Sequence, residues 1–321
     1  MPDAIRLISG TANPAFTQSI FEHLQEQSVD SKIVDAEIGH FSDGETRVQI
    51  KDTVRGYRLY VVQPTCPPVN DNLMELCAIL DALKRASAAT ITAVVPYYGY
   101  SRQERKGMPR VPINAKMVAR FIEIAGAHRV VAMDFHAPAI QGFFEIPVDN
   151  LYAYPVLAEN LKKSLSGQDT VIVSPDIGGT SRARMLAEYI GAELAIIEKR
   201  RSEDSGDIKL FKVIGDVDGK KAILCDDIVA SGKSLIRAAD LLDQAGASEV
   251  WAAATHGVLC GNAVQDIDES RIKSIVITDT IAPKQEEGPK FFRASVAGVF
   301  ADTIRRIHEN RSVSDIFNHK Y

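Results

Sequence analysis

The chain has 321 residues, a net charge of −5, and charged side chains at 25% of its positions. The length predicts about two domains, and a hydrophobic content of 45% is enough to bury a sizeable core. A net negative charge argues against a nucleic-acid partner, which needs a basic face. It still allows small phosphate ligands, which require only local clusters of cations.

Targeting and membrane signals are not expected. No apolar run approaches the roughly 18 residues that a membrane helix needs, and residues 1–6 lack the charged flank and apolar core of a signal peptide. The cysteines have no metal-type spacing and are expected as reduced thiols; they are Cys66, Cys77, Cys225 and Cys260. We therefore expect a cytoplasmic protein without a membrane partner.

Strand-like runs alternate with amphipathic helices, the pattern of an α/β protein with mostly parallel sheets flanked by helices. The first half predicts a helix that opens at Asn70-Asp71-Asn72 with Glu75 closing a capping box, a strand at 89–95, a helix between Pro112 and Gly126, and a strand at 129–133. The second half predicts strands at 170–173, 193–198 and 222–225, and helices at 180–190 and 234–245.

The two halves share a short echo. Residues 125–136 align with residues 245–256 at an offset of 120, with six of twelve positions identical. Any junction between a helix and a strand favours Ala-Gly-Ala before Val, but this does not explain the match of His136 with His256. We interpret the echo as two copies of one α/β unit that meet near residues 149–154.

The copies differ where chemistry would occur. In the echo alignment Asp134 has Ala254 as its counterpart, and the paired carboxylates Asp226 and Asp227 belong to the second copy only. Ligands of open α/β sheets bind beyond the carboxyl ends of the strands. The difference therefore predicts two different ligands that meet at the junction of the halves.

The strongest motif spans residues 224–234, where a buried strand ends in Asp226 and Asp227 before a small-residue loop and a helix start. Adjacent carboxylates can accept hydrogen bonds from the vicinal hydroxyls of a ribose, and the N–H groups of a helix N-terminus can cradle a phosphate. A plain strand-to-helix turn is the alternative. A Walker loop is excluded because its first glycine would fall at Ile228. The motif resembles the phosphoribosyl-pyrophosphate loop of type I phosphoribosyltransferases.

Weaker motifs lie in the first half. Residues 39–45 contain an Asp-Gly turn that could be no more than a hairpin tip. Residues 97–106 place tyrosines before arginines, so that an aromatic face could stack on a base and guanidinium groups could bind phosphate. Residues 134–138 combine an aspartate with His136, which could hold Mg²⁺ although histidine is an unusual ligand for it.

Two further motifs lie in the second half. The glycines of residues 174–180 would let backbone N–H groups approach a pyrophosphate, with Asp176 on the accompanying metal. Residues 198–206 end a strand in three cations before a polar stretch that we expect to be a mobile loop. Such cations would neutralise the charge that develops in phosphoryl transfer.

In this order the motifs resemble the ribose-phosphate diphosphokinase (phosphoribosyl pyrophosphate synthetase) family over nearly the whole chain, from Ile5 to Phe317. The resemblance implies two tandem type I phosphoribosyltransferase-like domains, here residues 1–149 on the nucleotide side and residues 150–321 on the ribose 5-phosphate side. It leaves open that the last helix packs back on the first domain. It also implies a magnesium-dependent transferase of nucleotide biosynthesis that acts on ATP and ribose 5-phosphate. In that family dimers assemble into hexamers or tetramers.

The resemblance also assigns roles to individual residues. It implies catalytic cations at Lys199 and Arg201, and metal positions at His136 and Asp176. The ATP-binding positions that it implies are Phe41, Asp43, Gly44, Glu45, Arg102 and Gln103. The ribose 5-phosphate positions that it implies are Arg201, Asp226, Asp227, Ala230, Ser231, Gly232, Lys233 and Ser234. The implied reaction is an in-line attack of the anomeric hydroxyl on the β-phosphorus of ATP, with AMP as the leaving group.

The chain departs from the family at two places. Residues 230–234 differ from the commonest Asp-Thr-Ala-Gly-Thr loop, although the backbone cradle and hydroxyls remain. Pro109 stands where regulated members carry a serine, and proline has neither hydroxyl nor N–H. The second change leaves activation by phosphate and inhibition by ADP undecided.

Three alternatives compete with this reading. A type I phosphoribosyltransferase would share Asp226 and Asp227 but would not need Phe41 or a second domain. A non-catalytic subunit of the same family would be expected to lose Lys199 or Arg201, and both are present. A structural protein leaves the polar clusters at the strand ends unexplained.

Overall fold

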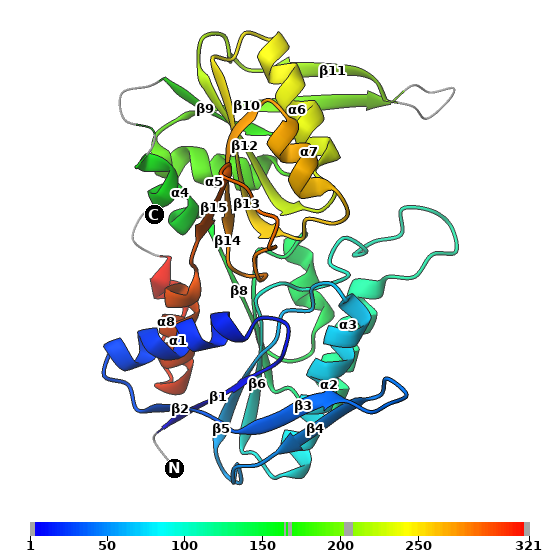
Figure 1. Cartoon of the computed structure of the whole chain (residues 1–321), viewed down its shortest axis with the longest axis vertical. Helices are drawn as coiled ribbons and strands as arrows, with labels where there is room; N and C mark the ends of the chain where they lie inside the picture. The colour runs from blue at the N-terminus through cyan, green and yellow to red at the C-terminus, as the bar shows by residue number, and fades with distance from the viewer. Residues whose placement is uncertain (1–3, 164, 166–168, 202–207, 318–321) are drawn as a thin grey trace. The chain divides into compact units, whose positions relative to one another are not determined.

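The computed structural model describes residues 4–163, 165, 169–201 and 208–317, and side chains outside residues 199–211. The chain forms two compact units, one of residues Met1–Leu151, Thr280–Ala282 and Val296–Tyr321 and one of residues Tyr152–Asp279 and Pro283–Ser295. Each unit is an α/β sandwich in which helices cover both faces of a sheet, as the alternation of strands and helices predicts (Figure 1).

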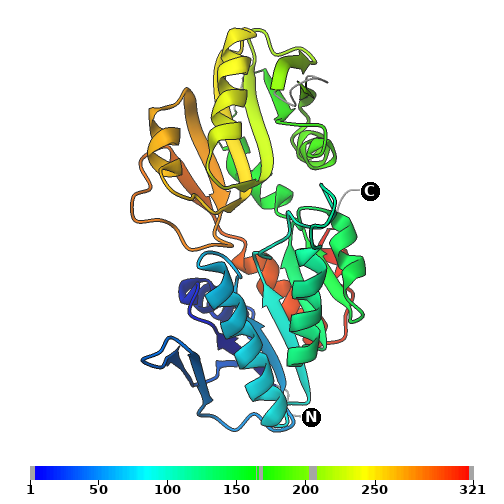
Figure 2. The same cartoon turned by 90° about the vertical axis from the view of Figure 1, so that its right-hand side faces the viewer.

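The first unit contains a parallel six-stranded sheet in the order β2-β1-β5-β6-β7-β8. Its strands are β1 (Ile5–Ser9), β2 (Ser31–Ile33), β5 (Arg58–Val62), β6 (Thr90–Val95), β7 (Arg129–Met133) and β8 (Val148–Leu151). Its helices are α1 (Pro14–Glu26), α2 (Val69–Arg85), α3 (Asn114–Ala125) and α8 (Ala297–His308), with the 3-10 helices η1 (Pro138–Phe143) and η2 (Ser314–Ile316). Helices α2 and α3 pack together on one face of the sheet, and α1 and α8 on the other (Figure 2). A hairpin of β3 (Ala36–His40) and β4 (Thr46–Ile50) packs on α2.

The second unit contains a seven-stranded sheet in the order β11-β10-β9-β12-β13-β14-β15, parallel except for the β10–β11 pair. Its strands are β9 (Thr170–Ser174), β10 (Glu193–Arg201), β11 (Ile208–Ile214), β12 (Lys221–Val229), β13 (Glu249–Gly257), β14 (Ile272–Thr278) and β15 (Phe291–Ala294). Its helices are α4 (Tyr154–Lys162), α5 (Thr180–Ile190), α6 (Lys233–Gln244) and α7 (Ala263–Glu269). Helices α4 and α5 pack together, and so do α6 and α7.

The two sheets follow one strand order, because β10-β9-β12-β13-β14-β15 repeats β2-β1-β5-β6-β7-β8. In this order β7 corresponds to β14. The echo of residues 125–136 and 245–256 instead pairs β7 with β13, one strand away from its counterpart. The repeat is therefore real but the echo alignment is wrong, because the shared Ala-Gly-Ala-Val composition belongs to any junction of a helix and a strand.

The helix that follows each sheet along the chain belongs to the other unit. After β8 the chain continues into α4, where Tyr154 packs edge-on to Tyr189 of α5, with ring centroids 5.8 Å apart. After β15 it continues into α8, where Phe300 packs edge-on to Phe16 of α1 at 5.4 Å. Arg58 of β5 also donates to the carbonyl of His308 at 2.9 Å. Residues 296–317 therefore belong to the first unit, although the boundary predicted at residue 149 assigns them to the second domain.

Three local predictions need correction. The strand expected at 222–225 continues to Val229, because β12 keeps pairing with β13 after its pairing with β9 ends at Leu224. The strand expected at 193–198 continues to Arg201, because β10 pairs with β11 as a hairpin. Helix α2 begins at Val69 without a side-chain cap, and Glu75 bonds to Thr11 rather than closing a capping box. Within the described residues no helix is both long and apolar enough to cross a membrane.

Candidate functional site

The paired carboxylates lie at the carboxyl end of β12. Asp227 is buried at 3% exposure, and its backbone N–H donates to the Oδ1 atom of Asp226 at 2.9 Å. Burial and the neighbouring charge of Asp227 raise the pKa of Asp226. Two carboxylates that share so little solvent favour a bound group that supplies hydrogen-bond donors or positive charge.

Arg182 is a site residue that sequence analysis missed. It lies in the first turn of α5, and its guanidinium Nη1 atom is 3.3 Å from Oδ1 of Asp227. The helix dipole disfavours a cation in the first turn of a helix. An arginine in the first turn of a helix is therefore unfavourable unless a nearby carboxylate compensates its charge. This position was the signal in the sequence from which a carboxylate partner of Arg182 could have been predicted.

A loop and the N-terminus of a helix follow the carboxylates. Gly232 caps the N-terminus of α6 with a φ of 71°, in the left-handed region that favours glycine. The carbonyl of Ala230 accepts a hydrogen bond from the N–H of Cys260 at 2.8 Å, which fixes the loop against the end of β13. Ser231, Lys233 and Ser234 are exposed. The sequence-predicted loop and carboxylates thus lie together at the end of one strand, with hydroxyls and helix N–H groups available for an anion.

The loop after β9 lies at the same edge of the sheet, since β9 and β12 are neighbouring parallel strands. Asp176 is exposed, and its Oδ1 atom accepts from the N–H of Gly179 at 2.9 Å. The hydroxyl of Ser174 donates to the carbonyl of Asp176 at 2.6 Å. This turn presents a carboxylate and the N-terminus of α5 on the same side as Asp226 and Asp227.

Lys199 and Arg201 lie in the backbone of β10, in register with Phe211 and Ile208 of β11. Both residues thus lie at the end of a strand, as the sequence analysis expects, and the polar stretch of residues 202–206 that was expected as a mobile loop lies outside the described residues. Their side chains lie outside the described residues.

In the first unit, the segment after β6 carries the predicted nucleotide contacts. Arg102 and Gln103 are exposed, and the Oε1 atom of Gln103 accepts from Nδ2 of Asn114 at 2.6 Å. Tyr98 is buried; its hydroxyl donates to the carbonyl of Ala115 at 2.8 Å. Buried contacts therefore anchor the segment at Tyr98, while Arg102 and Gln103 remain available to a ligand.

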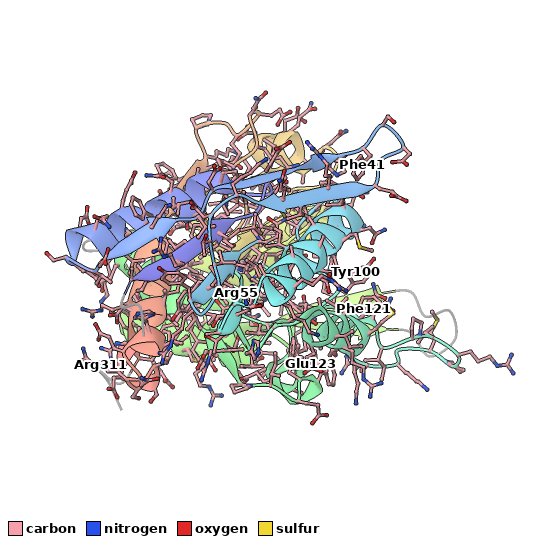
Figure 3. All side chains as sticks on the ribbon, turned by 90° about the horizontal axis from the view of Figure 1, so that it is seen from below. Phe41, Arg55, Tyr100, Phe121, Glu123 and Arg311 are labelled. Atoms are coloured by element: carbon pink, nitrogen blue, oxygen red, sulfur yellow. The ribbon has the colours of Figure 1, made fainter. Side chains whose placement is uncertain are left out.

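The predicted turn at residues 41–45 is the tip of the β3–β4 hairpin (Figure 3). The N–H of Gly44, with a φ of 93°, donates to the carbonyl of Phe41 at 3.0 Å, and the N–H of Glu45 donates to Oδ1 of Asp43 at 3.1 Å. The Phe41 side chain is 53% exposed, with the guanidinium of Arg47 6.0 Å from its ring centre. The hairpin forms a separate two-stranded sheet and presents an aromatic face outward.

His136 is exposed just after β7, next to the strand that leads to Arg102. Its predicted metal partner, Asp176, belongs to the other unit. Among residues whose side chains are described, no group of three or more His, Cys, Asp or Glu could hold a metal ion. Magnesium usually takes one or two protein ligands and completes its shell with water and substrate phosphates, so His136 and Asp176 fit a metal carried by a substrate better than a resident ion.

Comparisons with known proteins cover both units. Residues 5–126 match the family model of the N-terminal domain of ribose phosphate pyrophosphokinase, and residues 208–318 match that of the phosphoribosyl synthetase-associated domain. The chain is 51% identical to the ribose-phosphate pyrophosphokinase of Caldanaerobacter subterraneus and 46% identical to that of Thermotoga maritima, each over 98% of both chains. The crystal structure of phosphoribosylpyrophosphate synthetase from Mycobacterium smegmatis superposes with a TM-score of 0.88 at 36% identity, covering 96% of this chain and 99% of that one. The chain therefore belongs to the ribose-phosphate pyrophosphokinase family.

Proposed function

We propose that this protein transfers the diphosphate group of ATP to ribose 5-phosphate, forming AMP and 5-phospho-α-D-ribose 1-diphosphate. The observation that carries this proposal is the carboxylate pair of half-buried Asp226 and buried Asp227, followed directly by the N-terminus of α6. One element binds hydroxyls and the other binds a phosphate, as a ribose phosphate requires. Membership of the family makes this reaction the one that the site serves best.

The second unit would hold the acceptor. The 5-phosphate would sit on residues 230–234, with N–H groups of α6 and the hydroxyls of Ser231 and Ser234 as donors. The ribose hydroxyls would donate to Asp226 and Asp227. The anomeric hydroxyl would attack the β-phosphorus in line, and its oxygen would form the new bond as the bond to the AMP oxygen breaks.

The first unit would hold the nucleotide. Arg102 and Gln103 would contact ATP, and the hairpin residues Phe41, Asp43 and Glu45 would offer an aromatic face and polar groups to it. The exposed ring of Phe41 at the end of a projecting hairpin supports its use in a neighbouring copy. We therefore include self-association, at least as a dimer, in the proposal.

Charge neutralisation would come from Lys199 and Arg201 together with magnesium. Bound magnesium would be held by His136 or Asp176 and would lower the negative charge on the transferred group. Most of the rate would come from positioning and from these cations, because phosphoryl transfer requires little covalent chemistry from the protein.

The test is an assay of the purified protein with ribose 5-phosphate, Mg-ATP and phosphate, in which AMP and the sugar diphosphate are followed together. We expect the two products in equal amounts. Lys199→Ala should lower kcat by about 10²- to 10³-fold, the usual effect of removing one donor from a transition state. Lys212→Ala is the matched control, because Lys212 is an exposed cation on the β11 strand of the same hairpin. An inactive wild type, or equal losses in both variants, would contradict the proposal.

A further inference from the structure

One buried threonine forms hydrogen bonds with the backbone of the segment that leads to Arg102 and Gln103. Thr65 lies in the loop between β5 and α2 and is 1% exposed. Its hydroxyl accepts from the N–H of Gly99 at 2.6 Å and donates to the carbonyl of Tyr97 at 3.2 Å. The Thr65 N–H also donates to the carbonyl of Tyr97, at 2.9 Å. Thr65 thus fixes both sides of Tyr98 in the chain.

The contact between the two loops leaves no room for adjustment. A Cβ atom added at Gly99 would lie 2.4 Å from the carbonyl oxygen of Thr65, well inside van der Waals contact. Glycine at this position lets the two backbones approach closely enough for the hydroxyl to bridge Gly99 and Tyr97. The hydroxyl and the glycine therefore form a single clamp.

The clamp precedes a strained residue. Tyr100 has a φ of 64°, in the left-handed region that an aromatic residue rarely adopts. Such a conformation persists only where its surroundings hold it. The Tyr100 hydroxyl donates to Oδ1 of Asn70 in the first turn of α2, and the carbonyl of Tyr100 accepts from the N–H of Gln103 at 2.9 Å. Thr65 and Asn70 therefore hold the two ends of a strained turn that leads to the exposed side chains of Arg102 and Gln103.

We propose that Thr65 is a positioning residue for the nucleotide: its hydroxyl fixes the backbone of residues 97–100 so that Arg102 and Gln103 are presented to ATP. This inference rests on the proposed function, in which Arg102 and Gln103 contact ATP. Thr65 does not itself touch a substrate. Its loss should weaken ATP binding and leave the acceptor unit unaffected.

Thr65→Val keeps the shape of the side chain and removes the hydroxyl. The N–H of Gly99 then lacks its partner, and the strained turn can relax. A lost hydrogen bond of this kind corresponds to roughly a 5- to 30-fold change in an equilibrium constant. We expect the KM for ATP and the Kd for Mg-ATP to rise by about that factor, with the KM for ribose 5-phosphate changed less than about two-fold. Thr65→Ser retains the hydroxyl and should restore both values.

Thr303→Val is the matched control. Thr303 is also fully buried in the first unit, and its hydroxyl donates to the carbonyl of Val299 within its own helix, at 2.8 Å. This variant should lose stability without any change in ATP binding. Asn70→Ala is a second test at an exposed position, where misfolding is not expected; it releases the Tyr100 hydroxyl and should raise the KM for ATP by a smaller factor.

The outcomes separate the inference from the function on which it rests. An inactive wild type would remove the proposed function before any variant is compared. An active wild type with an unchanged Kd for Mg-ATP in Thr65→Val would overturn the positioning role. The same holds if Thr65→Val does not fold and Asn70→Ala binds ATP normally, or if the KM for ribose 5-phosphate rises in parallel with that for ATP.

Discussion

The two units place different groups at the same position of the same sheet. β1 and β9 are equivalent five-residue strands; β1 pairs Ile8 with Val61 of β5, and β9 pairs Val173 with Leu224 of β12. Two residues beyond Val61 and Leu224 stand Gln63 and Asp226. Three residues beyond Ile8 and Val173 stand Thr11 and Asp176. Gln63 and Thr11 are therefore the counterparts of Asp226 and Asp176.

In the first unit this position is closed by protein. Gln63 is fully buried, and its Nε2 atom donates to Oε1 of Glu75 at 2.8 Å. The N–H and hydroxyl of Thr11 donate to the two carboxylate oxygens of Glu75 at 2.7 and 2.6 Å. A Cβ atom at Gly10 would lie 2.0 Å from Oε1 of Gln63. In the first unit, protein side chains thus bond to one another at the position that Asp226 and Asp176 hold in the second.

In the second unit the same position is open to a ligand, and its acidic groups are expected to lower the stability of the fold. Burial and Asp227 raise the pKa of Asp226, Asp176 is exposed, and the loop at Gly232 leaves helix N–H groups free of side-chain caps. The comparison teaches that one framework can use its strand ends for stability or for binding. In the first unit the candidate ligand contacts lie further along the sheet, after β6 and β7.

The contacts of Glu75 with Thr11 and Gln63 should stabilise the first unit. Glu75→Ala would remove a buried carboxylate that accepts from the N–H and hydroxyl of the exposed residue Thr11, and it would leave the Gln63 amide only its long bonds to Asn72, at 3.4 and 3.5 Å. Hydrogen bonds to a charged group are worth about 1.5–3 kcal/mol. We expect the free energy of unfolding to fall by about 1.5–3 kcal/mol in denaturant titrations. Glu75→Gln, which keeps the shape and one acceptor, should lose less.

A loss below about 1 kcal/mol for Glu75→Ala would show that the cluster is not what closes the first unit. A comparable loss in the exposed control Glu22→Ala would show that the measurement does not report on the cluster. Glu22 lies in the same unit, on α1, and bonds only to Gln18 of its own helix among the described contacts.

The carboxylates of the second unit should instead be essential for the use of ribose 5-phosphate. Asp227→Asn preserves the volume of the side chain and removes the charge that pairs with Arg182. Hydrogen bonds to charged groups are worth about 1.5–3 kcal/mol, so we expect kcat/KM for ribose 5-phosphate to fall by roughly 10- to 100-fold. The Kd for Mg-ATP should stay constant in calorimetry. Asp240→Asn on α6 is the control, and equal effects on both substrates would remove the division of labour between the units.

The sequence predicts those parts of the site that are continuous in the chain. Asp226, Asp227 and residues 230–234 lie within nine residues, so a strand, a carboxylate pair and a helix start can be recognised together. The strand at 129–133 and the helix at 180–190 have the predicted bounds in the structure, because apolar periodicity and flanking glycines mark them locally.

The parts that long-range contacts create could not be predicted. Arg182 meets Asp227 across 45 residues, and Glu75 meets Thr11 across 64, so neither pairing has a local pattern. Glu75 resembled a capping residue because its spacing from Asn72 fits that motif, but the helix starts earlier and buries it. The echo failed for a related reason, since the equivalence of strands is set by their order in the sheet.

Substitution of Arg182 tests whether its positive charge stabilises the neighbouring carboxylates Asp226 and Asp227. Arg182→Met removes the guanidinium 3.3 Å from Asp227 and keeps an apolar stem of similar length. Because the positive charge of Arg182 lowers the pKa of Asp226, its loss should raise that pKa further and weaken binding of ribose 5-phosphate by roughly five- to ten-fold. Arg182→Lys should recover part of the affinity. Arg184→Met, on the same helix, is the control; unchanged affinity in Arg182→Met would leave Asp227 without a functional partner in α5.

The smallest effect concerns pH and has opposite signs at two aspartates. The pKa of Asp226 is raised in the folded protein, so its contribution to stability is complete below the unfolded pKa of about 4 and is lost as the pH rises toward the folded pKa. Asp226→Asn cannot ionise, so its Tm should exceed that of the wild type by more at about pH 8 than at about pH 5. Asp216 is the contrast: its hydrogen bond with Lys220 lowers its pKa, so its contribution is present above about pH 4 and is lost in acid. Asp216→Asn should therefore lower the Tm slightly at both pH values. A gain for Asp226→Asn that does not grow with pH would mean that the open position carries no electrostatic cost, and the contrast with the closed position would then rest on shape alone.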